Sequence, residues 1–167
     1  MQCACCGTCC QKGPPGLHLE DVVLYADGVL DKAHLLTLRR GEPVRDNVAG
    51  HVVTLSEEMV RLKSDPGSAA CIMLQGENHC RIYDRRPLQC RALKCWDTSE
   101  LERIYARNRA GRLDLIPEDS ALAEIIREHE RQCSLEGLQE TVEQVRREGG
   151  GEAQDRIGAL VERDAWF

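Results

Sequence analysis

The chain has few aromatic residues and no long hydrophobic stretch. Only 4% of its 167 residues are Phe, Trp or Tyr, and Phe167 is the one phenylalanine. So few large rings predict a thin hydrophobic core, and small domains often supplement such a core with bound metal. No segment approaches the roughly 18 apolar residues that a transmembrane helix requires. We therefore expect a protein without a membrane span.

An excess of positive charge is also missing. The formal net charge is -6, whereas nucleic-acid binding requires a basic face that neutralises phosphates. We expect no nucleic-acid partner. The start of the chain has neither the basic residues nor the apolar run of a secretion signal, so we expect a cytoplasmic, reducing environment. A phosphate-binding loop, a Ser–His–Asp pattern and paired catalytic carboxylates are absent as well.

Cysteine, in contrast, is abundant, with 10 residues in two clusters. The first cluster places four cysteines in eight residues, and the second is more widely spaced. The members are Cys3, Cys6, Cys9 and Cys10, followed by Cys71, Cys80, Cys90 and Cys95. Thiolates are soft ligands, and C-x-x-C spacing brings two sulfur atoms to one metal ion. In a reduced chain this spacing favours a zinc or iron–sulfur centre over disulfides.

Neighbouring residues raise further expectations about these cysteines. Cys9 and Cys10 are adjacent, and adjacent side chains in extended backbone point to opposite sides. We expect them to face two sites, or one of them to pack against the core. Cys5 falls outside the repeat of three and is expected either to be a spare thiol or to replace Cys3 as a ligand. Arg86 and Arg91 flank Cys90, where they either offset thiolate charge or form surface ion pairs.

A second pattern lies near the end of the chain. His129 and Cys133 are four residues apart on the apolar stripe of an expected helix. This spacing is able to chelate a metal ion. A single buried histidine is more often an ordinary core residue than a ligand, so we expect core packing here and keep metal binding as the alternative.

Hydrophobic periodicity predicts an α+β fold that is mostly α-helical. Helices are expected at about 20–26 and 31–41, with Asp31 as the N-cap of the second, and a small antiparallel β element at 51–84. Further helices are expected from 98 onward, with the last ending at Trp166 and Phe167. We expect Cys-rich loops around a metal centre, followed by C-terminal helices. Residues 1–148 would form the cysteine-cluster domain and residues 149–167 a helical appendage.

Two motifs, read together, resemble a known family. Cys3-x-x-Cys6-Gly7-x-Cys9-Cys10 is followed by Cys71-x8-Cys80-x-Ile82-Tyr83-x-x-Arg86-Pro87-x-x-Cys90-Arg91. This order is similar to the CxxCxxCC (YkgJ-type) cysteine cluster family, a zinc- or iron-chelating domain. The resemblance covers about residues 3–95, and the eight family cysteines map onto the two clusters given above. Cys5 and Cys133 lie outside the family pattern.

The resemblance implies a metal centre without fixing a reaction. A small metalloprotein with a redox, metal-handling or accessory role fits best, and its centre is either 4Fe-4S or zinc. One alternative is a protein-modifying enzyme, because flagellin lysine methylases carry a related motif. Another is a structural zinc module that presents residues 134–167 to a protein partner.

Overall fold

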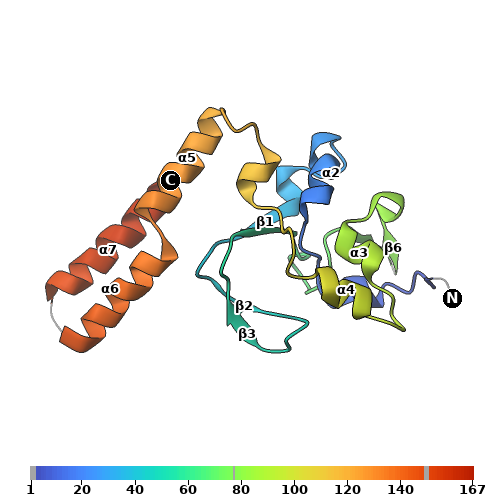
Figure 1. Ribbon diagram of the computed structural model, residues 1–167, viewed down its shortest axis with the longest axis horizontal. Coiled ribbons are helices and arrows are strands. Elements are labelled where there is room, and N and C mark those ends of the chain that lie inside the picture. Colours follow the sequence, from blue (N-terminus) through green and yellow to red (C-terminus); the bar gives the residue numbers. More distant parts are fainter. Residues whose placement is uncertain (1–2, 77, 149–150) are drawn as a thin grey trace.

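The structure, a computed structural model, describes residues 3–76, 78–148 and 151–167. It has two parts that follow one another along its longest axis (Figure 1). One part contains the N-terminus, short strands and short helices, and the other is an arm of three longer helices that includes the C-terminus. This arrangement confirms the predicted α+β, mostly helical fold class.

The elements in the described residues follow in chain order. The 3₁₀ turns are η1 (Leu19–Asp21), η2 (Lys32–His34), η3 (Tyr83–Arg85) and η4 (Arg112–Leu115). The strands are β1 (Leu35–Leu38), β2 (Pro43–Arg45), β3 (Val52–Thr54), β4 (Met59–Leu62), β5 (Leu74–Gln75) and β6 (His79–Cys80). The helices are α1 (Thr8–Gln11), α2 (Val22–Ala26), α3 (Leu88–Ala92), α4 (Ser99–Ile104), α5 (Ala121–Gln132), α6 (Leu135–Glu148) and α7 (Gly151–Trp166).

Strand β4 is the centre of the N-terminal part. It pairs antiparallel with β1 along one edge. Along the other edge the Leu17 N–H donates to the Val60 carbonyl at 2.8 Å, and the Val60 N–H donates to the Ala110 carbonyl at 2.7 Å. The hydrophobic core surrounds this strand and includes Leu17, Leu24, Leu30, Val60, Leu62, Cys71, Met73 and Ala110. One of the predicted metal-ligating cysteines is therefore a core residue.

The segment 31–41 corrects one prediction. Asp31 does cap a helical turn, since its carboxylate accepts the Ala33 N–H at 2.8 Å. That turn ends at His34, and the leucines after it form β1 instead of a helix. Leu35 pairs with Leu62 across the sheet. The pairing with a distant strand overrides the local helical preference of these leucines.

The predicted β element at 51–84 is present as separate pairs of strands. In the described residues β2 pairs with β3 and β5 pairs with β6, both antiparallel, while β4 joins β1. Cys80 ends β6, and Cys71 makes a single bridge to Ser64. The small β element was thus predicted correctly, but its division into three pairs was not.

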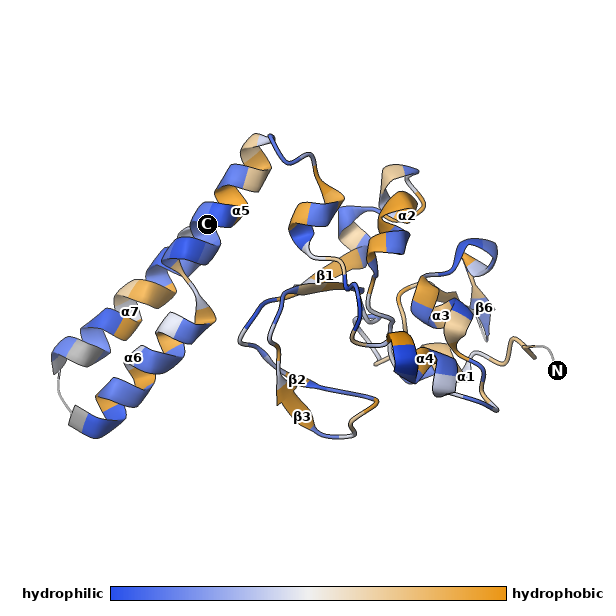
Figure 2. Ribbon diagram, in the orientation of Figure 1, coloured by the Kyte–Doolittle hydropathy of each residue, from blue (hydrophilic) through white to orange (hydrophobic). Residues whose placement is uncertain are grey.

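The helical arm consists of α5, α6 and α7, as the hydrophobic periodicity predicted. The Ser120 hydroxyl accepts the Ala123 N–H at 3.2 Å and caps the start of α5. Apolar and polar residues alternate around these helices (Figure 2), and α7 packs along α6 and reaches α5. The predicted domain boundary after residue 148 passes through residues 149–150, which lie outside the described residues, and it stays a prediction.

An ion-pair network joins the arm to the N-terminal part. The Glu130 carboxylate on α5 accepts hydrogen bonds from Arg39 Nε at 2.8 Å and from Arg112 Nη2 at 2.5 Å. Arg112 also donates to Glu58, which precedes β4. Burial opposes ionisation of Glu130, but the two arginines lower the pKa of its carboxyl group. A single carboxylate therefore holds together the end of β1, η4 and α5.

Replacing Glu130 with glutamine is expected to lower the free energy of unfolding by about 1–3 kcal/mol. Arg39 and Arg112 are mostly buried, and the substitution removes the negative charge that both of them contact. We therefore expect a larger loss of stability than for a surface ion pair. Chemical denaturation followed by circular dichroism measures the free energy of unfolding of the variant and of the wild type. Glu124→Gln, at an exposed position of the same helix, is the matched control. Equal stability of the two variants would contradict the assigned role.

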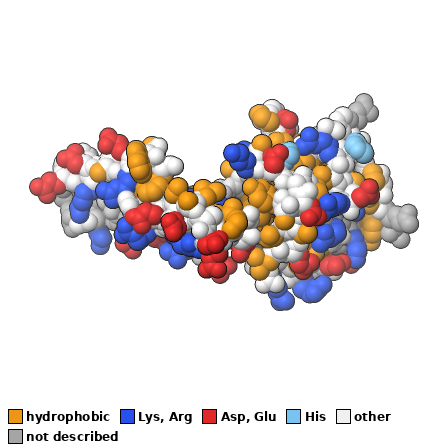
Figure 3. Space-filling view, turned by 90° about the horizontal axis from the view of Figure 1, so that it is seen from above, with side chains coloured by type: hydrophobic (Ala, Val, Ile, Leu, Met, Phe, Trp, Pro, Cys, Tyr) orange, Lys and Arg blue, Asp and Glu red, His pale blue; other side chains and the backbone are white. Residues whose placement is uncertain are grey.

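Charges of both signs are interspersed over the face seen in Figure 3, which also shows the narrowing between the two parts. This mixture agrees with the interleaved basic and acidic residues of the sequence. None of the helices in the described residues has a segment long and apolar enough to span a bilayer. Trp166 is 81% exposed at the end of α7, and the protein partner expected for this arm stays a prediction.

Candidate metal centre

The first cysteine cluster enters the structure as a turn followed by the short helix α1. Gly7 precedes α1 with φ of 73°, a left-handed conformation that glycine adopts without strain. A Cβ atom built at Gly7 would lie 2.5 Å from the side-chain oxygen of Asn78. Glycine therefore allows the first cluster to lie directly against the turn between β5 and β6. This turn leads into Cys80.

Helix α1 corrects the expectation that Cys9 and Cys10 face two sites, whereas the packing of Cys10 against the hydrophobic core agrees with the alternative that one of them packs there. Their backbone is helical, and their sulfur atoms are 4.0 Å apart. Neighbouring residues on a helix differ by about a quarter turn, compared with half a turn in extended backbone. The two thiols are therefore able to lie on one side of the chain, and both belong to the same group of cysteines.

Backbone hydrogen bonds bring the second cluster to the first. The Cys71 N–H donates to the Cys10 carbonyl at 2.8 Å, and the Arg81 N–H donates to the Met73 carbonyl at 2.9 Å. Cys71 is 5% exposed, while Cys10 and Cys80 pack against the same core cluster. Three cysteines from separate segments thus meet at the edge of the hydrophobic core.

Cys90 reaches this place on helix α3, which is held by buried polar side chains. Asp21 is fully buried and accepts the His18 N–H at 3.0 Å and the Leu88 N–H at 2.8 Å. The Gln89 side chain accepts the Gly16 N–H at 3.0 Å, and its amide nitrogen lies 3.2 Å from Nε2 of His18. These contacts fix the start of α3 relative to the segment that follows the first cluster.

Five thiols form an electrostatically coupled group, which we call the central cysteine group: Cys9, Cys10, Cys71, Cys80 and Cys90. Burial, followed by the charges of the other four members, raises the pKa of Cys90. Burial and the neighbouring Cys9 raise the pKa of Cys10 to about 12. Burial also raises the pKa of Cys71. Such thiols resist ionisation unless a cation compensates their negative charge.

The other three predicted ligands, Cys3, Cys6 and Cys95, are exposed. The Cys3 sulfur accepts the Cys5 N–H at 3.4 Å, and hydrogen bonds from this N–H and from Tyr83 lower the pKa of Cys3. The Cys6 sulfur lies 3.3 Å from the Thr8 hydroxyl. Cys95 lies in the turn after α3, where the backbones of Lys94 and Asp97 form an isolated antiparallel β-bridge. All three are more exposed than the members of the central cysteine group, which are buried or half-buried.

The two arginines that flank Cys90 have different surroundings. The Arg86 guanidinium stacks 3.8 Å from the centre of the Tyr83 ring, and its Nε is buried with no acceptor among the described residues. Arg91 donates to the Arg86 carbonyl at 2.8 Å and lies 3.9 Å from Glu20 at the surface. Arg86 therefore provides a positive charge and an unused N–H donor beside Cys3. Arg91 instead forms an ion pair at the surface.

The thiols are free to act as ligands. None of the ten cysteines, all of which are among the described residues, is joined to another by a disulfide. The Cys9 and Cys10 sulfurs are 4.0 Å apart, close to the roughly 3.8 Å that separates two sulfurs in a tetrahedral zinc site with sulfur 2.3 Å from the metal.

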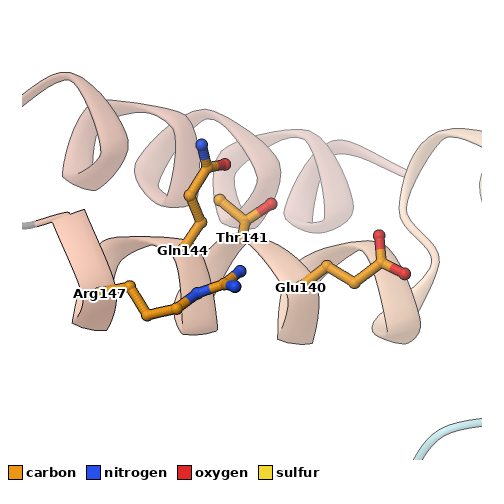
Figure 4. Close-up of a pocket in the computed structure, with 4 residues that line it drawn as sticks. All are labelled: Glu140, Thr141, Gln144 and Arg147. Atoms are coloured by element: carbon orange, nitrogen blue, oxygen red, sulfur yellow. The ribbon is translucent and has the colours of Figure 1, made fainter.

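A surface hollow elsewhere on the molecule has a different character. It is lined by Glu140, Thr141, Gln144 and Arg147, which all project from α6 on the arm (Figure 4). The lining side chains are polar, and none of them is a cysteine or histidine. This hollow is therefore separate from the cysteines.

Sequence reasoning identified the cysteines but missed the residues that position them. Asp21, His18 and Gln89 are buried polar residues whose partners lie up to 73 positions away in the chain. In the sequence, these residues stand only at a change from polar to apolar residues near the start of a helix. Such a change is typical of any helix N-cap and does not indicate a buried hydrogen bond. Long-range hydrogen bonds of this kind have no fixed sequence spacing, so no pattern reports them.

Comparisons with known proteins agree with this chemistry. The sequence model of a family named CxxCxxCC, with the description "Putative zinc- or iron-chelating domain", matches residues 2–110. The match contains all of the central cysteine group and ends before α5. No curated protein and no solved structure matches the chain.

Proposed function

Since the chain belongs to the CxxCxxCC family of zinc- or iron-chelating domains, we propose that its cysteines hold an iron–sulfur centre with a redox or metal-handling role. The observation that carries the proposal is the convergence of Cys9, Cys10, Cys71, Cys80 and Cys90 from separate segments at the edge of the core. A set of soft sulfur donors suits iron–sulfur and zinc centres and suits hard cations poorly.

The number of thiols supports a polynuclear centre over a single zinc ion. The central cysteine group alone provides five thiols, and one tetrahedral zinc ion takes four ligands. Eight thiolates exceed the need of one zinc ion. When bound, an iron–sulfur cluster supplies reversible one-electron chemistry.

The proposed ligands divide into two sets. The central cysteine group provides preformed donors, and Cys3, Cys6 and Cys95 are exposed residues on adjoining segments that complete the eight. Arg86 beside Cys3 provides positive charge and an N–H donor, which offset the negative charge of several thiolates. Tyr83 holds this arginine by stacking and hydrogen-bonds Cys3. These residues orient the first cluster and partly neutralise it.

Metal and acid-labile sulfide analysis of protein purified without oxygen tests the proposal. We expect iron and sulfide in equal amounts, together with the broad visible absorption of an iron–sulfur cluster. Colourless protein with stoichiometric zinc would overturn the iron–sulfur assignment and leave the cysteine site in place. Folded protein without either metal would overturn the site itself.

A further inference from the structure

We propose that the helical arm contains a second metal site, of the zinc type, formed by His129, Cys133 and Asp164. One ligand atom from each residue lies within 4.8 Å of the other two. This site is outside the family match at residues 2–110. It is independent of the proposed function of the central cysteine group.

Helix α5 places two of the donors on one side. The Cys133 N–H donates to the His129 carbonyl at 2.8 Å, so the helical hydrogen-bond pattern continues to the residue that caps α5. Residues four apart on a helix lie one above the other. The imidazole and the thiol are therefore presented together, in the spacing that metal-binding helices use.

The third donor comes from α7, which folds back against α5. Asp164 Oδ1 lies 2.8 Å from Nε2 of His129, although the two residues are 35 positions apart. Neutral imidazole, thiolate and carboxylate carry two negative charges together, which match a divalent ion. Nitrogen, sulfur and oxygen in one site suit zinc, a borderline-soft ion that leaves a fourth position for water.

The surroundings of the three donors also fit a metal ion. A hollow of about 70 Å³ is bounded by Cys133 and Asp164 together with apolar side chains of α6 and α7. It is large enough for water. The centre of the Phe167 ring lies 5.2 Å from the centre of the His129 ring, so the imidazole has an aromatic neighbour. Cys133 is only 6% exposed, which protects the thiol.

Arg39 orients two of the proposed ligands. Its guanidinium donates to Asp164 Oδ1 at 2.9 Å and to the Cys133 carbonyl at 2.5 Å. Hydrogen bonds of this kind to ligating residues are a regular part of metal sites. The positive charge of Arg39 is matched by Glu130, which accepts two hydrogen bonds from it. The arginine therefore fixes the carboxylate without leaving an unpaired cation beside the metal.

Zinc titration of the full-length protein distinguishes this site from a simple His129–Asp164 ion pair. We expect Cys133→Ser to bind one zinc equivalent fewer than wild type, or to bind it at least 10- to 100-fold more weakly. Serine is close to cysteine in size and leaves the His129–Asp164 pair intact. Asp164→Asn should show the same loss, whereas the matched control Asp155→Asn, at an exposed position of α7, should bind as wild type does.

Two readouts make the result decisive. Cobalt in place of zinc should give a sulfur-to-metal charge-transfer band in wild type, and its intensity should fall in Cys133→Ser. The iron or zinc content of the central cysteine group should stay unchanged in this variant, so failure of one site is distinguishable from failure of the other. Equal zinc stoichiometry and affinity in wild type and Cys133→Ser would overturn the proposal.

Discussion

Cys90→Ser is expected to release the metal of the central cysteine group and to lower the thermal stability of the N-terminal part. Cys90 is coupled to all four other members of the group. Its replacement removes one sulfur donor from the group, and the binding free energy of a structural metal contributes directly to folding. Metal-to-protein ratios and thermal melts, each with and without chelator, measure both effects.

Cys5→Ser is the matched control for this experiment. Cys5 is exposed, has a positive φ of 49°, and lies outside the central cysteine group. We expect this variant to keep its metal and its melting temperature. If Cys90→Ser and Cys5→Ser retain metal equally, or if chelator leaves the wild-type melt unchanged, the assigned ligands are wrong.

Asp21→Ala is expected to lower the free energy of unfolding by about 2–4 kcal/mol, because it leaves two buried N–H groups without an acceptor. These are the N–H groups of His18 and Leu88, and Asp21 itself is fully buried. Since Leu88 begins α3, the change should also loosen Cys90 and weaken metal retention. Denaturant unfolding and metal analysis of the same preparation measure the two effects.

Asp27→Ala provides the comparison for Asp21→Ala. Asp27 pairs with Arg85 at the surface, where its side chain is 49% exposed, so its removal should cost no more than about 1 kcal/mol. Asp21→Asn keeps one acceptor and should fall between the two alanine variants. A stability of Asp21→Ala equal to that of Asp27→Ala would show that the buried carboxylate does not hold α3.

The sequence predicted those features that depend on short-range spacing. The C-x-x-C repeat identified the cysteines, and apolar residues at helical intervals identified α5, α6 and α7. Leu35–Leu38 was taken as helical because its strand partner, Met59–Leu62, lies more than twenty residues further along the chain. Local preference decides little where backbone pairing is long-range.

Other features were beyond sequence reasoning for the same physical reason. The i, i+4 spacing of His129 and Cys133 was visible, but Asp164 joins them only because α7 folds back onto α5. The greater exposure of Cys3, Cys6 and Cys95 also depends on the path of the chain. Spacing reports what one segment is able to bind, while tertiary packing decides which segments meet.

The hydrogen bond between Cys71 and Cys10 has a consequence for biosynthesis. The two clusters are separated by much of the first half of the chain, so a ribosome must complete and release residues beyond Cys90 before all five donors are able to meet. Closing so large a loop is slow compared with forming a helix hairpin. Loading of the proposed centre must therefore await synthesis of more than half of the chain, and before that moment the nascent thiols are exposed to oxidation or to the wrong ion.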